Sequence, residues 1–298
     1  CPHSLCKSTL HVGDLPGGGP GGPGTGLAWD RLTGVTQYYG GQEKGTAAFL
    51  AQTLEMEEYI RTIPAAVQVI RQKKRSARHV RLSIDEWGVW AVPGNSVNRE
   101  IENNPWQMAA PISEQIYTME DALLFAGMQM AMLRNADVVK IACQSLLTNV
   151  SACIMTDTNG EMWLQTIYYP FYYFANYARG VVMQSKCRCE SYECEGFNEV
   201  PYLDQLVVWN TERREVAIFL VIRSGTDSQE VKTELQGMAP VSVAGAVSLF
   251  AKDKKMTNYI DHNAVRPEKF EAVLLQDDCV TAQLPPLSFV VIRIAVQK

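Results

Sequence analysis

A carboxylate lies between aromatic residues where an apolar segment of the chain ends. The segment 82–90 reads Leu-Ser-Ile-Asp-Glu-Trp-Gly-Val-Trp. Desolvating an ionised carboxylate costs free energy unless neighbouring groups compensate, and the flat faces of Trp87 and Trp90 suit a sugar ring. Carboxylates at the carboxyl ends of strands are typical of glycosidase sites. Because side chains alternate along a strand, we expect only one of Asp85 and Glu86 to point into such a site.

A simpler interpretation is that Asp85 and Glu86 mark a strand emerging into water. The two indoles favour the sugar-binding interpretation. A second acidic pair, Glu120 and Asp121, follows Thr118 in the pattern of a helix capping box, so we interpret that pair as a helix start and not as catalytic carboxylates.

The elements around these residues are predicted to alternate between strands and helices. Apolar residues recur at three- and four-residue spacing where helices are expected, and β-prone runs lie between them. The predicted elements are a strand at 35–40, a helix at 46–74 that contains Pro64, a strand at 79–87, a helix at 118–135 with core methionines, a buried strand at 138–143 and an aromatic-rich helix at 163–183. This alternation predicts parallel βα units, although three units cannot close a barrel.

After about residue 184 the pattern changes to short β-prone runs with no helix between them. The predicted strands lie at 205–209, 216–223, 241–250, 272–275 and 287–296. Such a series predicts an antiparallel β-sandwich.

The composition excludes some partners. With 298 residues, 47% of them hydrophobic, the chain can bury one large core or two moderate ones. A formal net charge of -5 offers no positive surface for nucleic acid. No apolar segment approaches the roughly 20 residues that span a bilayer, so we expect no membrane association. Gly and Pro dominate 13–26, and residues 1–34 are expected to be a flexible tail.

The cysteines do not predict a disulfide scaffold or a metal site. Eight of them are spread over positions 1, 6, 143, 153, 187, 189, 194 and 279. Cys187, Cys189 and Cys194 supply three potential thiolates, fewer than the four ligands of a structural zinc site. We expect reduced thiols in a mobile loop and no bound metal.

Beyond these patterns, several segments resemble, in the same order, the α-L-arabinofuranosidases of glycoside hydrolase family 51. They are 82–90, 114–124, 137–143, 165–171, 178–180, 200–204 and 284–288. The resemblance extends from about Val35 to the end of the chain. It implies the carboxyl-terminal part of a (β/α)8 TIM barrel, with its last three βα units at 35–183, followed by an antiparallel β-sandwich at 184–298.

The resemblance also implies roles for individual residues. Glu86 would be the nucleophile of a retaining glycosidase, and Tyr38 and Trp90 would contact the substrate. The implied partner is an arabinose-containing oligosaccharide, with no metal or organic cofactor. Relatives of this kind suggest a cytoplasmic location and a possible homo-oligomer.

The chain departs from the family at several positions. The family's acid/base glutamate lies in an Asn-Glu motif upstream of the matched region, and no such segment precedes Glu86. Asn198-Glu199 falls on the wrong side of the nucleophile. Thr36 replaces a histidine, and Leu146 replaces a sugar-contacting glutamine, with Gln144 displaced by two positions.

These departures lead to the expectation that this 298-residue polypeptide is an incomplete arabinofuranosidase with weak or no activity. Residues 1–34 are hypothesised to replace the start of a longer gene product. The alternative is a non-catalytic carbohydrate-binding or assembly protein derived from such an enzyme. Another retaining glycosidase, such as a xylosidase, is a third hypothesis.

Overall fold

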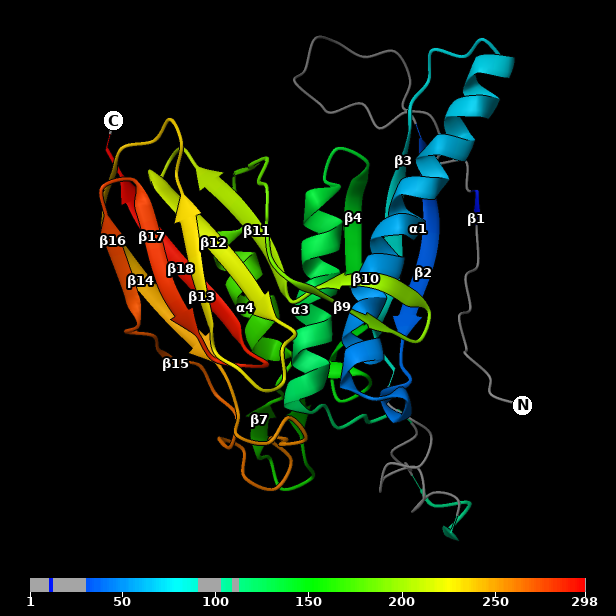
Figure 1. The fold of residues 1–298 in the computed structure, drawn as a ribbon. Coiled ribbons are helices and arrows are strands. Elements are labelled where there is room, and N and C mark those ends of the chain that lie inside the picture. Colours follow the sequence, from blue (N-terminus) through cyan, green and yellow to red (C-terminus); the bar gives the residue numbers. More distant parts are fainter. Residues whose placement is uncertain (1–10, 13–30, 91–102, 109–112, 298) are drawn as a thin grey trace.

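A parallel sheet with its helices and an antiparallel sandwich lie side by side, with helix α3 between them (Figure 1). The computed structural model describes residues 11–12, 31–90, 103–108 and 113–297. Most of the predicted tail therefore lies outside the described residues.

The first sheet is four-stranded, in the order β1-β2-β3-β4. Its strands are β1 (His11–Val12), β2 (Arg31–Tyr39), β3 (Val80–Val89) and β4 (Val139–Gln144). Strands β2, β3 and β4 are parallel, as predicted, whereas β1 pairs antiparallel with β2. Strand β2 begins at Arg31, four residues before the predicted Val35, so the end of the expected tail is part of the sheet.

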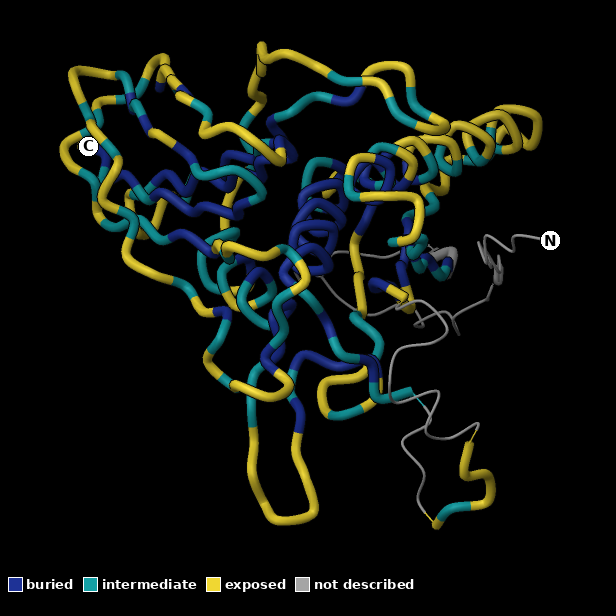
Figure 2. Tube along the Cα trace, turned by 60° about the horizontal axis from the view of Figure 1, so that its bottom comes forward, coloured by how far each residue is buried: buried dark blue, intermediate teal, exposed yellow. Residues whose placement is uncertain are grey.

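Two long helices follow the first two parallel strands. The 3-10 helix η1 (Gln42–Lys44) precedes α1 (Thr46–Lys73), which contains Pro64 as predicted. Helix α3 (Met119–Arg134) begins with the predicted capping box, in which Thr118 and Asp121 satisfy each other's backbone N–H groups. Figure 2 shows α3 buried along most of its length. In α1, by contrast, all buried residues lie between Ala48 and Ile60.

Strand β4 was predicted to be buried, and this was wrong. Lys140 to Cys143 are exposed, with Ile141 39% exposed. The reason is its place in the sheet: among the described residues, β3 is the neighbour of β4 on one side and no strand pairs with the other. The apolar sequence predicts a buried environment, but burial depends on a neighbouring element that the described residues do not supply.

The predicted helix at 163–183 was only partly correct. The chain after β4 forms a small sheet of β5 (Leu146–Thr148), β6 (Ala152–Thr156) and β7 (Met162–Leu164). Trp163 lies in β7, opposite Met155 of β6. Helix α4 (Tyr168–Tyr177) is shorter than predicted, and β8 (Val181–Val182) follows it.

The remaining strands form the predicted sandwich. Strands β8, β11 (Leu203–Asn210), β12 (Glu215–Ile222), β14 (Pro240–Leu249), β15 (Glu268–Lys269) and β18 (Phe289–Val296) form the six-stranded sheet. Strands β13 (Gln229–Glu234), β16 (Val273–Gln276) and β17 (Cys279–Leu284) form the three-stranded sheet. Strands β9 (Ser191–Cys194) and β10 (Phe197–Pro201) form a separate hairpin.

The six-stranded sheet is buried on both faces at its centre. Ile218 and Ile292 belong to the apolar cluster shared with the three-stranded sheet. Phe219 and Phe289 belong instead to the cluster that includes α3 and α4. Successive side chains of β12 and β18 point to opposite faces of the sheet and pack into two separate cores. This explains why these strands are nearly continuously apolar.

Buried ion pairs also join the parallel sheet's helices to the sandwich. Arg134 of α3 donates to Glu57 of α1 at 2.8 Å and to Asp204 of β11 at 2.7 Å. Arg223, which follows β12, donates to the other Asp204 oxygen at 2.6 Å. Because buried charges are tolerated when paired, this network fixes α1, α3 and β11 relative to one another.

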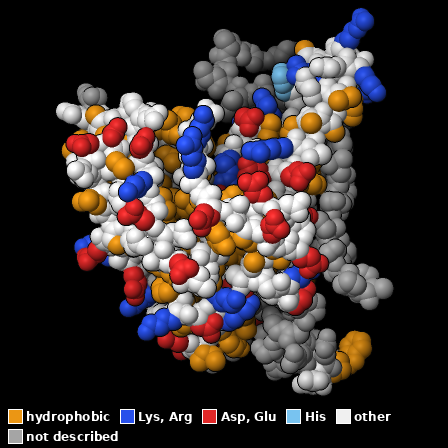
Figure 3. Space-filling model, in the orientation of Figure 1, with side chains coloured by type: hydrophobic (Ala, Val, Ile, Leu, Met, Phe, Trp, Pro, Cys, Tyr) orange, Lys and Arg blue, Asp and Glu red, His pale blue; other side chains and the backbone are white. Residues whose placement is uncertain are grey.

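On the molecular face seen in Figure 3, acidic and basic side chains are interspersed. Among the described residues, no helix is both long enough and apolar enough to cross a bilayer.

Candidate functional site

The site is built on an irregularity in β3. In the ladder between β2 and β3, Val35 pairs with Ile84 but Thr36 pairs with Glu86, so Asp85 is an extra residue in β3. Such a bulge breaks the alternation of side chains. Asp85 and Glu86 are both exposed, between buried Ile84 and buried Trp87. The regular alternation is therefore interrupted at this pair, and the expectation that only one of Asp85 and Glu86 points into the site stays a prediction.

Hydroxyl groups from two neighbouring parts of the sheet lie beside Glu86. Ser145, which follows β4, donates its hydroxyl to Glu86 Oε1 at 3.0 Å. The Tyr38 hydroxyl, from β2, lies close to both Ser145 and Glu86. Burial raises the pKa of Tyr38 well above its ordinary value, and the nearby charge of Glu86 adds to the rise. Tyr38 is therefore a neutral phenol at physiological pH and can donate to the carboxylate.

Trp90 presents an exposed indole beside this pair. It is 42% exposed, and its ring meets Tyr38 edge to face with centroids 5.6 Å apart. The Trp90 backbone N–H donates to Tyr39 at 2.7 Å. Glycine is needed at position 40, because a Cβ there would lie 2.8 Å from the carbonyl oxygen of Trp90. Trp90 thus packs on Tyr38, whose hydroxyl lies near Glu86, and the substrate contacts of Tyr38 and Trp90 stay a prediction.

Trp87 does not contribute a sugar-binding face, contrary to the interpretation from its sequence. It is 2% exposed and packs on Phe125 of α3 with ring centroids 4.6 Å apart. The bulge at Asp85 explains this, since it turns Glu86 outward and leaves Trp87 facing the helix.

The other carboxylates singled out in the sequence lie in other environments. Asp85 accepts a hydrogen bond from Ser83. Asp121 caps α3 and also accepts from Gln42 at 3.0 Å, and Glu120 is buried in an ion pair with Lys255. Glu199 lies on the exposed hairpin strand β10. For the described residues, the interactions of Glu86 do not include a second carboxylate.

The positions that depart from the family lie near the site with altered side chains. Thr36 is the ladder partner of Glu86. Leu146 is 50% exposed, so it places an apolar group where a polar contact was expected. Gln144 does not substitute for it, because its side-chain amide donates to the Ser151 carbonyl at 2.7 Å.

Sequence reasoning missed Ser145. The signal that could have found it is its place directly after β4, because the carboxyl ends of parallel strands meet at one edge of the sheet. A hydroxyl following the strand beside Glu86 is therefore a candidate partner of Glu86.

Metal-ligating side chains do not cluster in the described part of the chain. No group of three or more His, Cys, Asp or Glu residues is arranged to hold an ion there. The six cysteines that the structure describes are free thiols. Burial, followed by the proximity of Cys189, raises the pKa of Cys187 to about 12, so that thiol is protonated at neutral pH.

The arrangement provides an exposed carboxylate with hydroxyl groups beside it and an exposed aromatic ring that packs on one of them. Such a carboxylate can attack an anomeric carbon. Retention of configuration would need a second carboxyl group about 5 to 5.5 Å away.

The chain matches a known protein family over most of its length. Residues 85–288 match the α-L-arabinofuranosidase C-terminal domain. An intracellular exo-α-(1→5)-L-arabinofuranosidase from Halalkalibacterium halodurans is 38% identical over 257 residues, which cover 86% of this chain and 51% of that protein. The intracellular exo-α-(1→5)-L-arabinofuranosidase 1 of Bacillus subtilis is 35% identical, and the match covers 87% of this chain and 51% of that protein.

Solved structures agree with these matches. A family 51 α-L-arabinofuranosidase from Bifidobacterium longum superposes with a TM-score of 0.78 at 26% identity, covering 89% of this chain and 52% of that one. A GH51 arabinofuranosidase from Xanthomonas axonopodis shares the fold, with a TM-score of 0.72 at 23% identity. The match covers 88% of this chain and 52% of that one. The chain thus spans about half the length of the relatives it matches.

Proposed function

This chain belongs to the α-L-arabinofuranosidases of glycoside hydrolase family 51, and on that premise we propose that it is the carboxyl-terminal part of a retaining enzyme. The enzyme would release terminal arabinofuranosyl groups from arabinan or arabinoxylan oligosaccharides. The observation that carries the proposal is the cluster of Glu86, Tyr38, Ser145 and Trp90 at the ends of adjacent parallel strands.

The fold supports a matching division of the chain. We infer that residues 35–183 are the last three βα units of a (β/α)8 barrel and that residues 184–298 are the sandwich. The parallel order of β2, β3 and β4 supports the first part of this inference. The exposed apolar side chains along β4 and β5, among them Ile141 and Leu147, are what a further barrel strand and its neighbours would cover.

In this proposal Glu86 is the catalytic nucleophile. One of its oxygens bonds to the anomeric carbon while the bond to the leaving oxygen breaks, and the leaving group takes the electron pair. Tyr38 and Ser145 orient Glu86, and the Trp90 face packs on the furanose. The general acid/base that protonates the leaving group and later activates water would come from the portion of the relatives that this chain does not span.

Two consequences belong to the same proposal. The 298-residue chain alone should act weakly on natural oligosaccharides, because general acid/base catalysis contributes roughly 10² to 10⁴-fold. Several relatives are named intracellular, and we infer the same cytoplasmic location for the protein to which this chain belongs.

The test uses a substrate that needs no general acid. With 2,4-dinitrophenyl α-L-arabinofuranoside, whose leaving group departs unprotonated, the purified chain should slowly gain one pentosyl group on Glu86. The adduct should persist because, in this proposal, the base that activates water belongs to the portion of the relatives that this chain does not span. Intact mass spectrometry would detect it, and peptide mapping would locate it.

Two matched variants decide the role of Glu86. Glu86→Gln should abolish labelling, whereas Asp85→Asn, which alters the neighbouring exposed carboxylate, should retain it. Labelling that survives in Glu86→Gln would refute the nucleophile assignment. Oligosaccharide binding without any label on the wild-type chain would favour the non-catalytic carbohydrate-binding alternative.

A further inference from the structure

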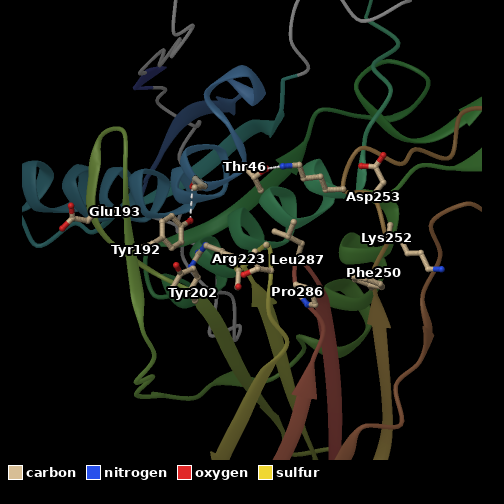
Figure 4. Close-up of a pocket in the computed structure, with 16 residues that line it drawn as sticks. Thr46, Tyr192, Glu193, Tyr202, Arg223, Phe250, Lys252, Asp253, Pro286 and Leu287 are labelled. Carbon is tan, nitrogen blue, oxygen red and sulfur yellow. Dashed lines mark hydrogen bonds between the residues drawn. The ribbon is translucent and has the colours of Figure 1, made fainter.

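A cavity lies away from Glu86, where α1, the β9–β10 hairpin and the sandwich meet. Its volume is about 690 Å³, within the range of ligand-binding pockets. Figure 4 shows its lining side chains, which come from the first turn of α1, the hairpin and the loops that leave β12 and β14. Glu86, Tyr38 and Trp90 are not among them.

Aromatic rings form part of the cavity wall. Tyr192 of β9 and Tyr202, just before β11, pack with ring centroids 5.0 Å apart. Tyr192 is fixed in place because its hydroxyl donates to the Ala47 carbonyl at 3.0 Å. Phe250, which follows β14, also lines the cavity and is 38% exposed. The cavity therefore offers aromatic surface to a ligand from two sides, the hairpin and the sandwich.

Two cationic side chains that line the cavity, those of Arg223 and Lys254, already interact with other protein groups. The Arg223 guanidinium donates to Asp204 at 2.6 Å, to Thr53 at 2.7 Å and to the Pro201 carbonyl at 2.9 Å. Lys254 donates to Thr46 and lies 4.0 Å from Glu120.

The remaining charged side chains of the lining are one cation and two anions. They are those of Lys252, Glu193 and Asp253. Hydroxyl groups of Ser224 and Thr226 complete the polar part of the wall. The lining thus suits a neutral ligand with many hydroxyl groups better than an anion, because the uncommitted charges of the wall are mostly negative.

We propose that this cavity is a second, non-catalytic glycan site that binds a neutral pentose oligosaccharide. The volume, the aromatic surface on two sides and a polar lining that disfavours anions carry the proposal. A pentose ring presents apolar C–H faces to aromatic rings and hydroxyl groups to the polar wall. Only the choice of pentoses as ligands rests on the proposed function.

Calorimetric titration of a Trp90→Ala chain isolates the cavity, because that variant removes the exposed indole beside Glu86. α-1,5-Arabinotriose and β-1,4-xylotriose are the two probes, and trigalacturonate is the charged comparison. We expect one neutral trisaccharide, or both, to bind. No binding of either, or tighter binding of trigalacturonate, would overturn the proposal.

Variants at the cavity then locate the bound sugar. In the Trp90→Ala background, Phe250→Ala should weaken binding by about tenfold, a loss of about 1.4 kcal/mol. Thr226→Trp, at an exposed loop position, should block binding without disturbing the core. Tyr172→Ala, at an exposed tyrosine of α4, is the matched control and should leave binding unchanged.

The outcomes separate this inference from the proposed function. Undiminished binding in Phe250→Ala and Thr226→Trp would refute the cavity as the site, whatever the labelling of Glu86. Cavity-dependent binding without a glycosyl label would contradict only the proposed catalytic role.

Discussion

Side-chain direction at the end of β3 decides which residues are available for chemistry. The bulge at Asp85 leaves Glu86 exposed and Trp87 buried against Phe125. The Ser145 hydroxyl then donates to the carboxylate, and the Tyr38 hydroxyl lies close to it. The nucleophile assignment therefore depends on local backbone geometry as much as on the Asp-Glu-Trp motif.

Replacing Tyr38 with Phe should slow the formation of the glycosyl adduct about tenfold or more, because a hydrogen bond to a charged group contributes about 1.5 to 3 kcal/mol. The raised pKa of Tyr38 means that its phenol stays protonated from neutral pH to beyond its ordinary pKa. The rate of labelling should therefore show no fall from Tyr38 ionisation as the pH rises through that range. Mass spectrometry over time, at several pH values, measures both effects.

Tyr172→Phe is the control for this prediction, because Tyr172 lies on α4 and is 42% exposed. Equal labelling rates for Tyr38→Phe and the wild-type chain would contradict a role for the Tyr38 hydroxyl in orienting Glu86.

Among individual residues, Glu86, Tyr38 and Trp90 could be proposed from the sequence because they lie in recognisable motifs. Ser145 could not, since a serine after a strand has no distinctive pattern. The burial of Trp87 was also unpredictable, because a bulge depends on how two strands align and not on the sequence of one strand.

At the scale of elements, the junction between α4 and β8 depends on a glycine. Gly180 has a φ of 146°, and a Cβ there would lie 2.1 Å from the carbonyl oxygen of Trp209. Since backbone on both sides limits relaxation, Gly180→Ala should destabilise the protein by at least about 2 kcal/mol. Urea unfolding followed by circular dichroism measures this change.

Gly160→Ala provides the comparison for Gly180→Ala. Gly160 also has a positive φ, 84°, but a Cβ there would meet nothing within 4 Å. Its substitution should cost only the backbone strain, about 1 to 2 kcal/mol. If the two variants lose equal stability, the contact with Trp209 is not what requires glycine at position 180.

The order of strands and helices was predictable because their periodicity is local. The capping box at Thr118 and the apolar runs of β12 and β18 carry their signals in adjacent residues. The exposure of β4 was not predictable, because it depends on which strand lies beside it. The strand β7 was missed because its three residues are too few to show a period.

In the whole molecule, the apolar core and the buried ion pairs join residues before position 184 to residues after it, although the sequence pattern changes there. One cluster contains Trp87, Phe125, Phe219 and Phe289, which come from both sides of that boundary. The parallel sheet and the sandwich should therefore unfold together in a single transition.

Asp204→Asn should destabilise this joint structure by about 3 to 5 kcal/mol at neutral pH, because it leaves the buried Arg223 without its carboxylate while Arg134 keeps only Glu57. Burial alone raises the pKa of Asp204, but the charges of Arg223 and Arg134 outweigh it and hold the pKa below its ordinary value. A lowered folded-state pKa means that this stability is present above the unfolded pKa of about 3.9 and is lost as the pH falls through the folded value. The difference between the two proteins should therefore shrink in acid.

Urea titrations at neutral and acidic pH measure that difference. Glu271→Gln is the control, since Glu271 forms an exposed pair with Lys269 and its loss should change stability little. If the stability lost in Asp204→Asn stayed constant down to strongly acidic pH, the dependence of stability on the protonation of Asp204 would be contradicted.

The extra residue in β3 also determines how this protein tolerates insertions and deletions. Side chains alternate between the two faces of β3 up to Ile84, and a new alternation begins at Glu86. The two alternations are out of step by one residue, so Ile84 and Trp87 are both buried. Removing Asp85 would let Ile84 and Glu86 follow each other opposite Val35 and Thr36, so the pairing of β2 with β3 would stay in register on both sides of the deletion. A one-residue deletion here would therefore take a carboxylate out of the Asp-Glu-Trp motif while leaving the sheet and the direction of Glu86 unchanged.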